Sequence, residues 1–153
     1  RKSEKMSQAI INQLIEEIEG KSLAESLRIV ANAFPGKVRF SSAFGQEDQV
    51  ITHAIFKHSI DIEVFTLDTG RLFPETYELI DRTRARYKQP IRVYYPKAEQ
   101  VEELVTKKGM HSFYESVENR KECCYIRKVE PLKRALRDTA NESCEPKVHN
   151  CDA

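Results

Sequence analysis

Residues 62–75 read IEVFTLDTGRLFPE, an apolar, β-branched run that ends in turn residues and then in a proline. The run 62–67 predicts a buried strand, and the residues at 68–70 predict a turn. Pro74 predicts the first turn of a helix, because the fixed φ of proline suits that position and its missing N–H is not needed there. A strand, a polar turn and a helix in this order form the first half of a βαβ unit.

The same order recurs on both sides of this stretch. Strands are predicted at 37–42 and 91–95, and helices at 47–58, 74–87 and 98–107. Strands that alternate with helices indicate βαβ units and a parallel sheet with right-handed crossovers. We therefore expect an α/β fold, a parallel sheet flanked by helices, whose ligands bind beyond the carboxyl ends of the strands.

Two further helices precede the first strand. One is predicted at 6–19, where isoleucines and leucine recur at helical spacing, and Gly20 ends it. The second begins after Ser22 and continues to about Phe34, because Ser22 and Glu25 have the spacing of a capping box.

The end of the chain changes in character. A last helix is predicted from about Val129, since Pro131 would lie in its first turn. Residues 138–153 have no periodicity and few apolar side chains, which is typical of an irregular tail. We expect one α/β domain over 1–137, with N-terminal helices in 1–34, as the chain length also favours.

Composition excludes several classes of protein. The formal net charge is +1, so no global field attracts nucleic acid or a membrane surface, and any anion site must be local. No apolar run approaches the ~20 residues of a spanning helix. The start of the chain is not typical of a secretory signal. All four cysteines lie in the last third, unlike those of a secreted disulfide scaffold, so we expect a cytoplasmic protein with reduced thiols.

The loop after the first predicted strand, SSAFGQED at 41–48, places two hydroxyls and a glycine before a helix. Backbone N–H groups there, with Ser41, Ser42 and Gly45, could cradle an anion. The loop is neither a Walker loop nor a dinucleotide fingerprint. An ordinary strand–helix turn with an acidic cap accounts for the same residues.

The loop after the second strand, LDTGRLFPE at 67–75, carries a cation directly after its turn. Its backbone groups could bind a base edge or a ribose, and Arg71 could pair with a phosphate. A plain turn before Pro74 is the alternative. Taken together, the two loops fit a nucleotide that lies across two adjacent strand ends.

Residues 121–128 read KECCYIRK, with Cys123 and Cys124 adjacent among charges. A disulfide between neighbours would close a strained ring. Two buried core cysteines are not expected side by side on an amphipathic element. A metal or cluster site, a redox site or chance remain. Arg127 and Lys128 alone predict a solvated basic helix face.

Three stretches, SSAFGQED, LDTGRLFPETYELID and KECCYIRKVEPLKRAL, resemble in order and spacing the assimilatory sulfonucleotide reductases, the adenylyl-sulfate (APS) and phosphoadenylyl-sulfate (PAPS) reductases. The resemblance covers about residues 37–137. It implies an adenine-nucleotide α-hydrolase-like, Rossmann-like fold with a pyrophosphatase-type loop. That loop is shared with ATP pyrophosphatases and sulfurtransferases, which usually have two glycines and then Asp-Ser where this chain has Phe44-Gly45 and Glu47-Asp48.

The resemblance also implies the site and the reaction. The implied substrate-binding residues are Ser41, Ser42, Gly45, Leu67, Thr69, Gly70, Arg71 and Lys128. The tandem Cys123-Cys124 is similar to the pair of the iron–sulfur branch, which mostly uses APS and holds a [4Fe–4S] cluster with four thiolates. The implied activity is reduction of APS to sulfite and AMP in sulfate assimilation, with thioredoxin or glutaredoxin as partner, in a monomer or a homo-oligomer.

The chain departs from the family pattern near its end. The family has a second Cys-x-x-Cys pair and a nucleophilic cysteine in Glu-Cys-Gly-Leu-His, whereas here Cys144 and Cys151 are seven residues apart and Lys147 lies between them. We therefore expect a chain that lacks the C-terminal part, with an absent or incomplete cluster. Cys151, close to His149, is the candidate nucleophile, because an imidazolium favours the thiolate.

Three other interpretations stay open on sequence alone. The first is a PAPS reductase. The second is a non-catalytic nucleotide- or zinc-binding remnant, and the third is an ATP pyrophosphatase or sulfurtransferase domain. The residues available to a tetrahedral zinc are Cys123, Cys124, Cys144, His149 and Cys151.

Overall fold

The computed structural model of the chain describes residues 2–137 and 139. Three strands, β1 (Arg39–Ser41), β2 (Glu63–Leu67) and β3 (Arg92–Tyr94), form one sheet in the order β1-β2-β3. Both strand pairs are parallel, with Phe40 opposite Val64 and Thr66 opposite Val93. The predicted parallel sheet is confirmed, although its outer strands are shorter than predicted.

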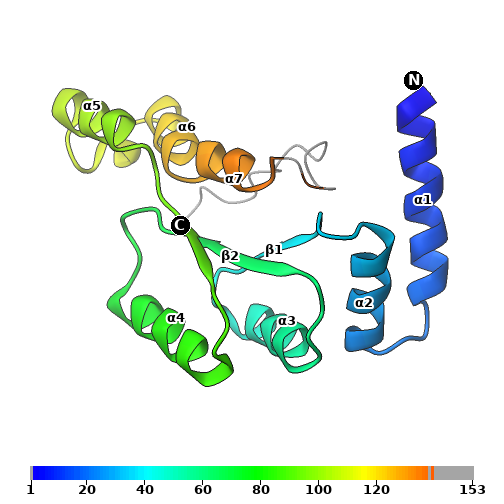
Figure 1. Cartoon of the computed structure of the whole chain (residues 1–153). Helices are drawn as coiled ribbons and strands as arrows, with labels where there is room; N and C mark the ends of the chain where they lie inside the picture. The colour runs from blue at the N-terminus through cyan, green and yellow to red at the C-terminus, as the bar shows by residue number, and fades with distance from the viewer. Residues whose placement is uncertain (1, 138, 140–153) are drawn as a thin grey trace.

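Helices cover both faces of the sheet (Figure 1). The first five helices along the chain are α1 (Lys2–Ile18), α2 (Leu23–Ala33), α3 (Gln46–Lys57), α4 (Pro74–Tyr87) and α5 (Ala98–Lys108). They are followed by a 3₁₀ turn η1 (Ser112–Tyr114), α6 (Val117–Cys124), a π-helical turn η2 (Tyr125–Val129) and α7 (Glu130–Ala135). In Figure 1, α3 and α4 lie on one side of the sheet, and α5, α6 and α7 on the other.

The core lies on both sides of β2. Val64 is 1 % exposed and packs with α2 and α3, while its neighbour Phe65 is 0 % exposed and packs with Tyr94 and Ala135. Successive side chains of a strand point to opposite faces, so a strand covered on both sides needs apolar residues at every position. This explains why the middle of β2, Val64–Thr66, is buried and is apolar apart from Thr66.

Local signals place several helix ends as predicted. Ser22 caps α2, and its hydroxyl and the Glu25 carboxylate make the two hydrogen bonds of a capping box. Pro74 opens α4, and Gly20 follows the end of α1 with a φ of +73°. Helix α1 begins earlier than predicted, and the turns and helix between residues 112 and 129 were not predicted at all.

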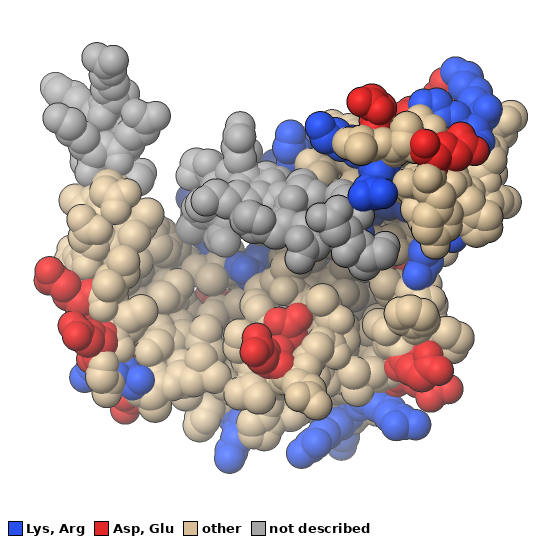
Figure 2. Space-filling model, turned by 180° about the vertical axis from the view of Figure 1, so that it is seen from behind, with Lys and Arg blue, Asp and Glu red and all other residues tan. Residues whose placement is uncertain are grey.

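In the described part of the chain, no helix is both long enough and apolar enough to span a bilayer. In Figure 2, basic side chains gather along the lower rim, while basic and acidic side chains mix at the corner formed by α5 and α6.

The division into a domain over 1–137 and a tail stays a prediction, and nearly all of 138–153 lies outside the described residues.

Candidate functional site

The loop after β1 is fixed to the sheet at its first residue. The Ser42 N–H donates to the Phe65 carbonyl at 2.8 Å, and the buried Ser42 hydroxyl accepts from the Phe44 N–H at 3.1 Å. Phe44 has a φ of +61° and buries its ring with Ile80 and Ile91. This anchored ring holds a non-glycine residue in the left-handed region and turns the chain into α3.

The start of α3 carries its own acidic partners. Gly45 is the N-cap, and the Asp48 carboxylate accepts from the Ala43 N–H at 2.7 Å. Glu47 and Asp48 lie in the first turn, where a carboxylate complements the helix dipole. The acidic cap is confirmed. Anion binding by this loop stays a prediction.

The loop after β2 is organised by a buried carboxylate. Asp68 is 5 % exposed and accepts from the Gly70 N–H at 2.8 Å and from the Tyr77 hydroxyl at 2.9 Å. Its own N–H donates to the Tyr94 carbonyl at 2.9 Å. Sequence reasoning treated Asp68 as a turn residue only and missed Tyr77. The Asp-x-Gly spacing was the available signal, since an Asp side chain often bonds its own backbone two residues on.

Arg71 contacts the segment that precedes α6. Its guanidinium donates to the Met110 carbonyl at 2.8 Å, lies 3.2 Å from His111 Nδ1, and stacks over the Phe113 ring at 4.8 Å. These contacts hold the loop after β2 against η1. A contact of Arg71 with a phosphate stays a prediction.

Both cysteines of the tandem pair are buried, which corrects the expectation that adjacent core cysteines would not occur. Cys123 is 9 % and Cys124 is 7 % exposed, at the end of α6. The side chains of neighbouring residues on a helix point ~100° apart, so burying both cysteines requires cover on more than one side of α6. Helix α6 contacts both η1 and η2. Cys123 has a free thiol.

The π-helical turn brings Arg127 inward. Arg127 is 9 % exposed and donates from Nη1 to the Thr69 carbonyl at 2.7 Å. The predicted solvated basic face is therefore wrong for Arg127 and right for Lys128, which is exposed. π-Helical turns are rare and are frequent at functional sites. This turn joins the third sequence motif to the second.

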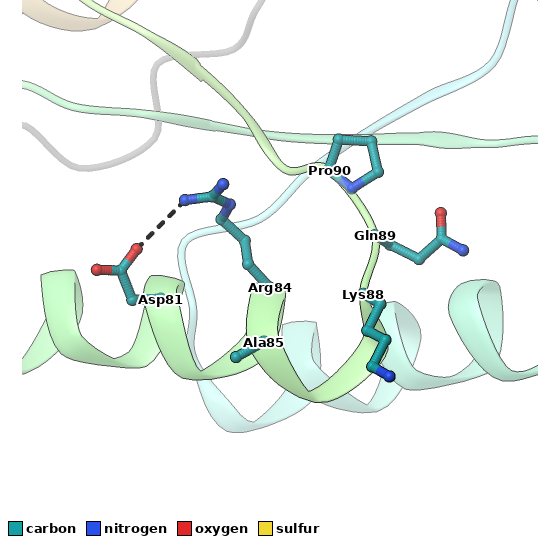
Figure 3. Close-up of a pocket in the computed structure, with 6 residues that line it drawn as sticks. All are labelled: Asp81, Arg84, Ala85, Lys88, Gln89 and Pro90. Atoms are coloured by element: carbon teal, nitrogen blue, oxygen red, sulfur yellow. Dashed lines mark hydrogen bonds and ion pairs between the residues drawn. The ribbon is translucent and has the colours of Figure 1, made fainter.

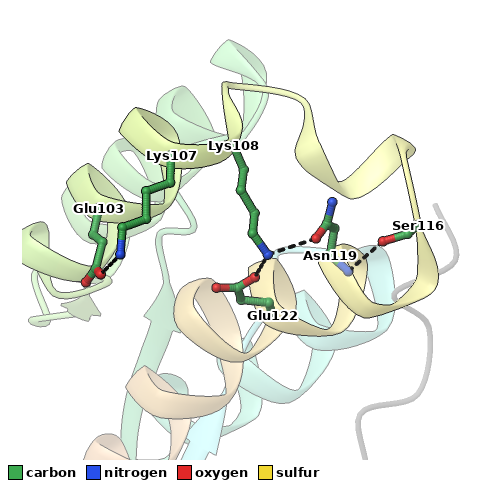
Figure 4. Close-up of polar contacts among 6 residues, drawn as sticks. All are labelled: Glu103, Lys107, Lys108, Ser116, Asn119 and Glu122. Carbon is green, nitrogen blue, oxygen red and sulfur yellow. Dashed lines mark hydrogen bonds and ion pairs between the residues drawn. The ribbon is translucent and has the colours of Figure 1, made fainter.

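Polar contacts at the surface hold α6 beside α5 (Figure 4). Lys108 reaches from the end of α5 to Asn119 at 2.9 Å and to Glu122 at 2.6 Å. The Ser116 hydroxyl caps α6 by accepting from the Asn119 N–H at 3.1 Å. Exposed ion pairs contribute little stability each, so their effect is to set where the cysteine-bearing helix lies.

The described residues do not complete a metal or cluster site. No group of three or more His, Cys, Asp or Glu side chains with suitable placement occurs among them. A [4Fe–4S] cluster takes four thiolates, and Cys123 and Cys124 supply two. The other candidate ligands, Cys144, His149 and Cys151, lie outside the described residues, as does the predicted nucleophile.

A surface hollow lies away from this edge (Figure 3). It is found where α4 ends and leads into the amino end of β3, and Asp81 pairs there with Arg84 at 3.5 Å. None of the predicted site residues lines it. Its lining is Asp81, Arg84, Ala85, Lys88, Gln89 and Pro90.

Comparisons with known proteins agree with the sequence resemblance. The family described as phosphoadenosine phosphosulfate reductase domain matches residues 37–144. The chain is 50 % identical over 102 residues to the adenosine 5′-phosphosulfate reductase of Burkholderia cepacia, covering 67 % of this chain and 41 % of that protein. It is 48 % identical over 123 residues to the protein of the same name from Sinorhizobium fredii strain NGR234, covering 80 % and 49 %. The chain thus spans less than half the length of these curated relatives.

A solved structure confirms the fold class. The crystal structure of PAPS reductase from Candida auris, in a phosphate complex, matches with a TM-score of 0.68 and 31 % identity, covering 82 % of this chain and 60 % of that one. The parallel sheet flanked by helices is therefore adenine-nucleotide α-hydrolase-like, as the sequence predicted.

The Asp68–Tyr77 contact gives a testable titration. Burial raises the pKa of the Tyr77 hydroxyl above its ordinary value, and the hydrogen bond to Asp68 and its charge raise the pKa further. The residue as a whole is 41 % exposed, but its hydroxyl is the part that meets the buried carboxylate. In Asp68→Asn we expect the pKa of Tyr77 to fall and yet stay above the ordinary value, because burial remains.

The measurement is the increase of tyrosinate absorbance as the pH is raised. Subtracting the curve of Asp68→Asn/Tyr77→Phe from that of Asp68→Asn isolates the titration of Tyr77. The same difference between the wild type and Tyr77→Phe provides the reference. A pKa of Tyr77 that does not move in Asp68→Asn would show that the carboxylate does not act on this hydroxyl.

Proposed function

Because the chain belongs to the phosphoadenosine phosphosulfate reductase family, we propose that it binds APS and serves thioredoxin- or glutaredoxin-dependent reduction of APS to sulfite and AMP. The curated relatives, named adenosine 5′-phosphosulfate reductases, support APS as the substrate. The tandem cysteines support the same branch of the family. Since the chain spans less than half of those relatives, the complete reaction belongs to the proposal.

One contact carries this proposal most directly. The bond from Arg127 to the Thr69 carbonyl places the cysteine-bearing helix beside the loop after β2. The loop after β1 is bonded to the same strand through Ser42 and Phe65. Three motifs from distant parts of the chain therefore meet at the carboxyl edge of the sheet, where α/β folds bind ligands.

The proposed site has two ends. The phosphosulfate end is assigned to Ser41, Ser42 and Gly45 with the N-terminus of α3, because backbone N–H groups at a helix start favour anions. The adenosine end is assigned to the loop after β2. The residues at that end are Leu67, Thr69, Gly70 and Arg71. Lys128, exposed on the π-helical turn, supplies a local cation for the sulfate.

The chemistry is a two-step transfer. A cysteine thiolate attacks the sulfur of APS, the bond from sulfur to the phosphate oxygen breaks, and AMP leaves, which forms an S-sulfocysteine. A thiolate of the partner dithiol then attacks the cysteine sulfur and sulfite leaves with the bonding electron pair. The second thiol resolves the mixed disulfide. The protein fold contributes position and charge, and Cys151 remains the proposed nucleophile.

A [4Fe–4S] cluster is proposed as the cofactor, with Cys123 and Cys124 as two of its four thiolate ligands. The cluster would organise the charges of the site, since the partner dithiol already brings both electrons.

PAPS is the alternative substrate, and the solved PAPS reductase with the same fold favours it. Isothermal titration of the chain with APS and with PAPS separates the two. We expect APS to bind at least tenfold more tightly, about 1.4 kcal/mol, with AMP as the control for the shared nucleoside. Tighter binding of PAPS would overturn the choice of APS.

The cofactor has its own test in anaerobic purification of the wild type, Cys123→Ser and Cys124→Ser, with iron, sulfide and zinc analysis. We expect iron and inorganic sulfide in equal amounts in the wild type, fewer than ~4 of each per chain because Cys151 is assigned to the nucleophile, and their loss in both variants. Circular dichroism confirms that the variants fold. One zinc per chain without iron would support a non-catalytic zinc-binding fragment instead.

A further inference from the structure

The guanidinium of Arg127 is buried. Arg127 is 9 % exposed, and within residues 2–137 and 139 no ion pair involves it. Its Nε–H is buried and has no acceptor among the described residues. Buried charges are usually paired, and a buried donor without an acceptor is rare enough to need an explanation.

Its single hydrogen bond joins two distant segments. Nη1 donates to the Thr69 carbonyl at 2.7 Å across 58 residues of sequence. Thr69 belongs to the loop that leaves the carboxyl end of β2, the central strand of the sheet. Arg127 itself lies four residues after the free, buried thiol of Cys123.

Gly70 makes room for this guanidinium. A Cβ built on Gly70 would lie 3.0 Å from Arg127 Nη1, which is closer than ordinary packing allows. Gly70 also has a φ of +79°, a conformation that favours glycine. Gly36 has a similar φ of +69°, but nothing lies within 4 Å of its built Cβ. The two glycines therefore separate the effect of backbone conformation from that of contact with Arg127.

We propose that Arg127 is a positioning residue for the sulfonucleotide. Its guanidinium fixes the loop after β2 relative to the cysteine pair. Binding of a nucleotide to that loop therefore also affects the segment that carries the cysteines. Arg127 acts on the nucleotide through the Thr69 carbonyl, to which its Nη1 donates. This inference rests on the proposed function, because it requires a nucleotide at the loop after β2.

Arginine is needed here for its geometry as well as its charge. The planar guanidinium presents donors in fixed directions, whereas a lysine ammonium is a point charge on a flexible stem. Arg127→Lys keeps the charge and removes both the bond direction and the Nε–H. Arg134→Lys is the matched control, because Arg134 also donates to a carbonyl after a strand, that of Tyr95 at 2.6 Å, but on β3.

The experiment measures AMP and APS affinity by isothermal titration in the wild type, Arg127→Lys, Arg134→Lys, Gly70→Ala and Gly36→Ala. A second readout is amide hydrogen exchange in residues 123–129, with and without AMP. We expect Arg127→Lys and Gly70→Ala to weaken binding at least tenfold and to abolish protection of 123–129 by AMP. Arg134→Lys and Gly36→Ala should bind within twofold of the wild type and keep that protection.

The outcomes distinguish this inference from the proposed function. If the wild type binds APS but Arg127→Lys binds it equally well and keeps the AMP protection of 123–129, the positioning role is refuted and the proposed function stands. If the wild type binds no sulfonucleotide, the proposed function fails and the inference fails with it. Should Arg127→Lys not fold, Gly70→Ala against Gly36→Ala decides, because equal affinities in that pair also refute the role.

Discussion

The hydrogen bond from the Arg127 guanidinium to the Thr69 carbonyl joins parts of the chain that the sheet alone would leave independent. The sheet sets where the loops after β1 and β2 emerge, but the cysteine pair reaches them only through the helices that follow β3 (Figure 1). A desolvated arginine in direct contact with a loop backbone is a strong constraint, since a hydrogen bond is electrostatically stronger in a medium of low dielectric than in water.

The two loops are held largely by their own hydrogen bonds. The Asp68 carboxylate accepts a hydrogen bond from a backbone N–H of the turn after β2. The Asp48 carboxylate and the Ser42 hydroxyl accept hydrogen bonds from backbone N–H groups of the turn after β1. Such internal bonds keep backbone geometry fixed before a ligand arrives, which is the usual requirement for a site that relies on position rather than on new contacts. The cations nearby, Arg71 and Arg127, are likewise held by carbonyl oxygens, and in the described part of the chain no ion pair to a carboxylate involves them.

Local patterns were sufficient for much of the fold. Helix α4 has the predicted bounds because Pro74 marks its start, and α2 because Ser22 and Glu25 cap it. The central strand was recognisable because burial on both faces favours a run that is mostly apolar and β-branched. The order of these elements then predicted the parallel sheet.

Features that depend on distant residues were not predictable. Helix α6 has a charged sequence without helical apolar spacing, so its position comes from contacts with η1 and α5. The burial of Arg127 requires the Thr69 carbonyl, 58 residues earlier, and a π-helical turn that no local signal announces. For the site, the sequence motifs named the two loops and the cysteines, and their grouping into one site stays a prediction. The motifs missed the Asp68–Tyr77 contact and the inward direction of Arg127.

If these three motifs form one nucleotide site, APS must change amide hydrogen exchange in all three of them. We expect APS to slow exchange together in 41–45, 67–71 and 123–129, and to leave the hollow at 81–90 unchanged. Protection confined to 81–90, or to only one of the three motifs, would contradict it.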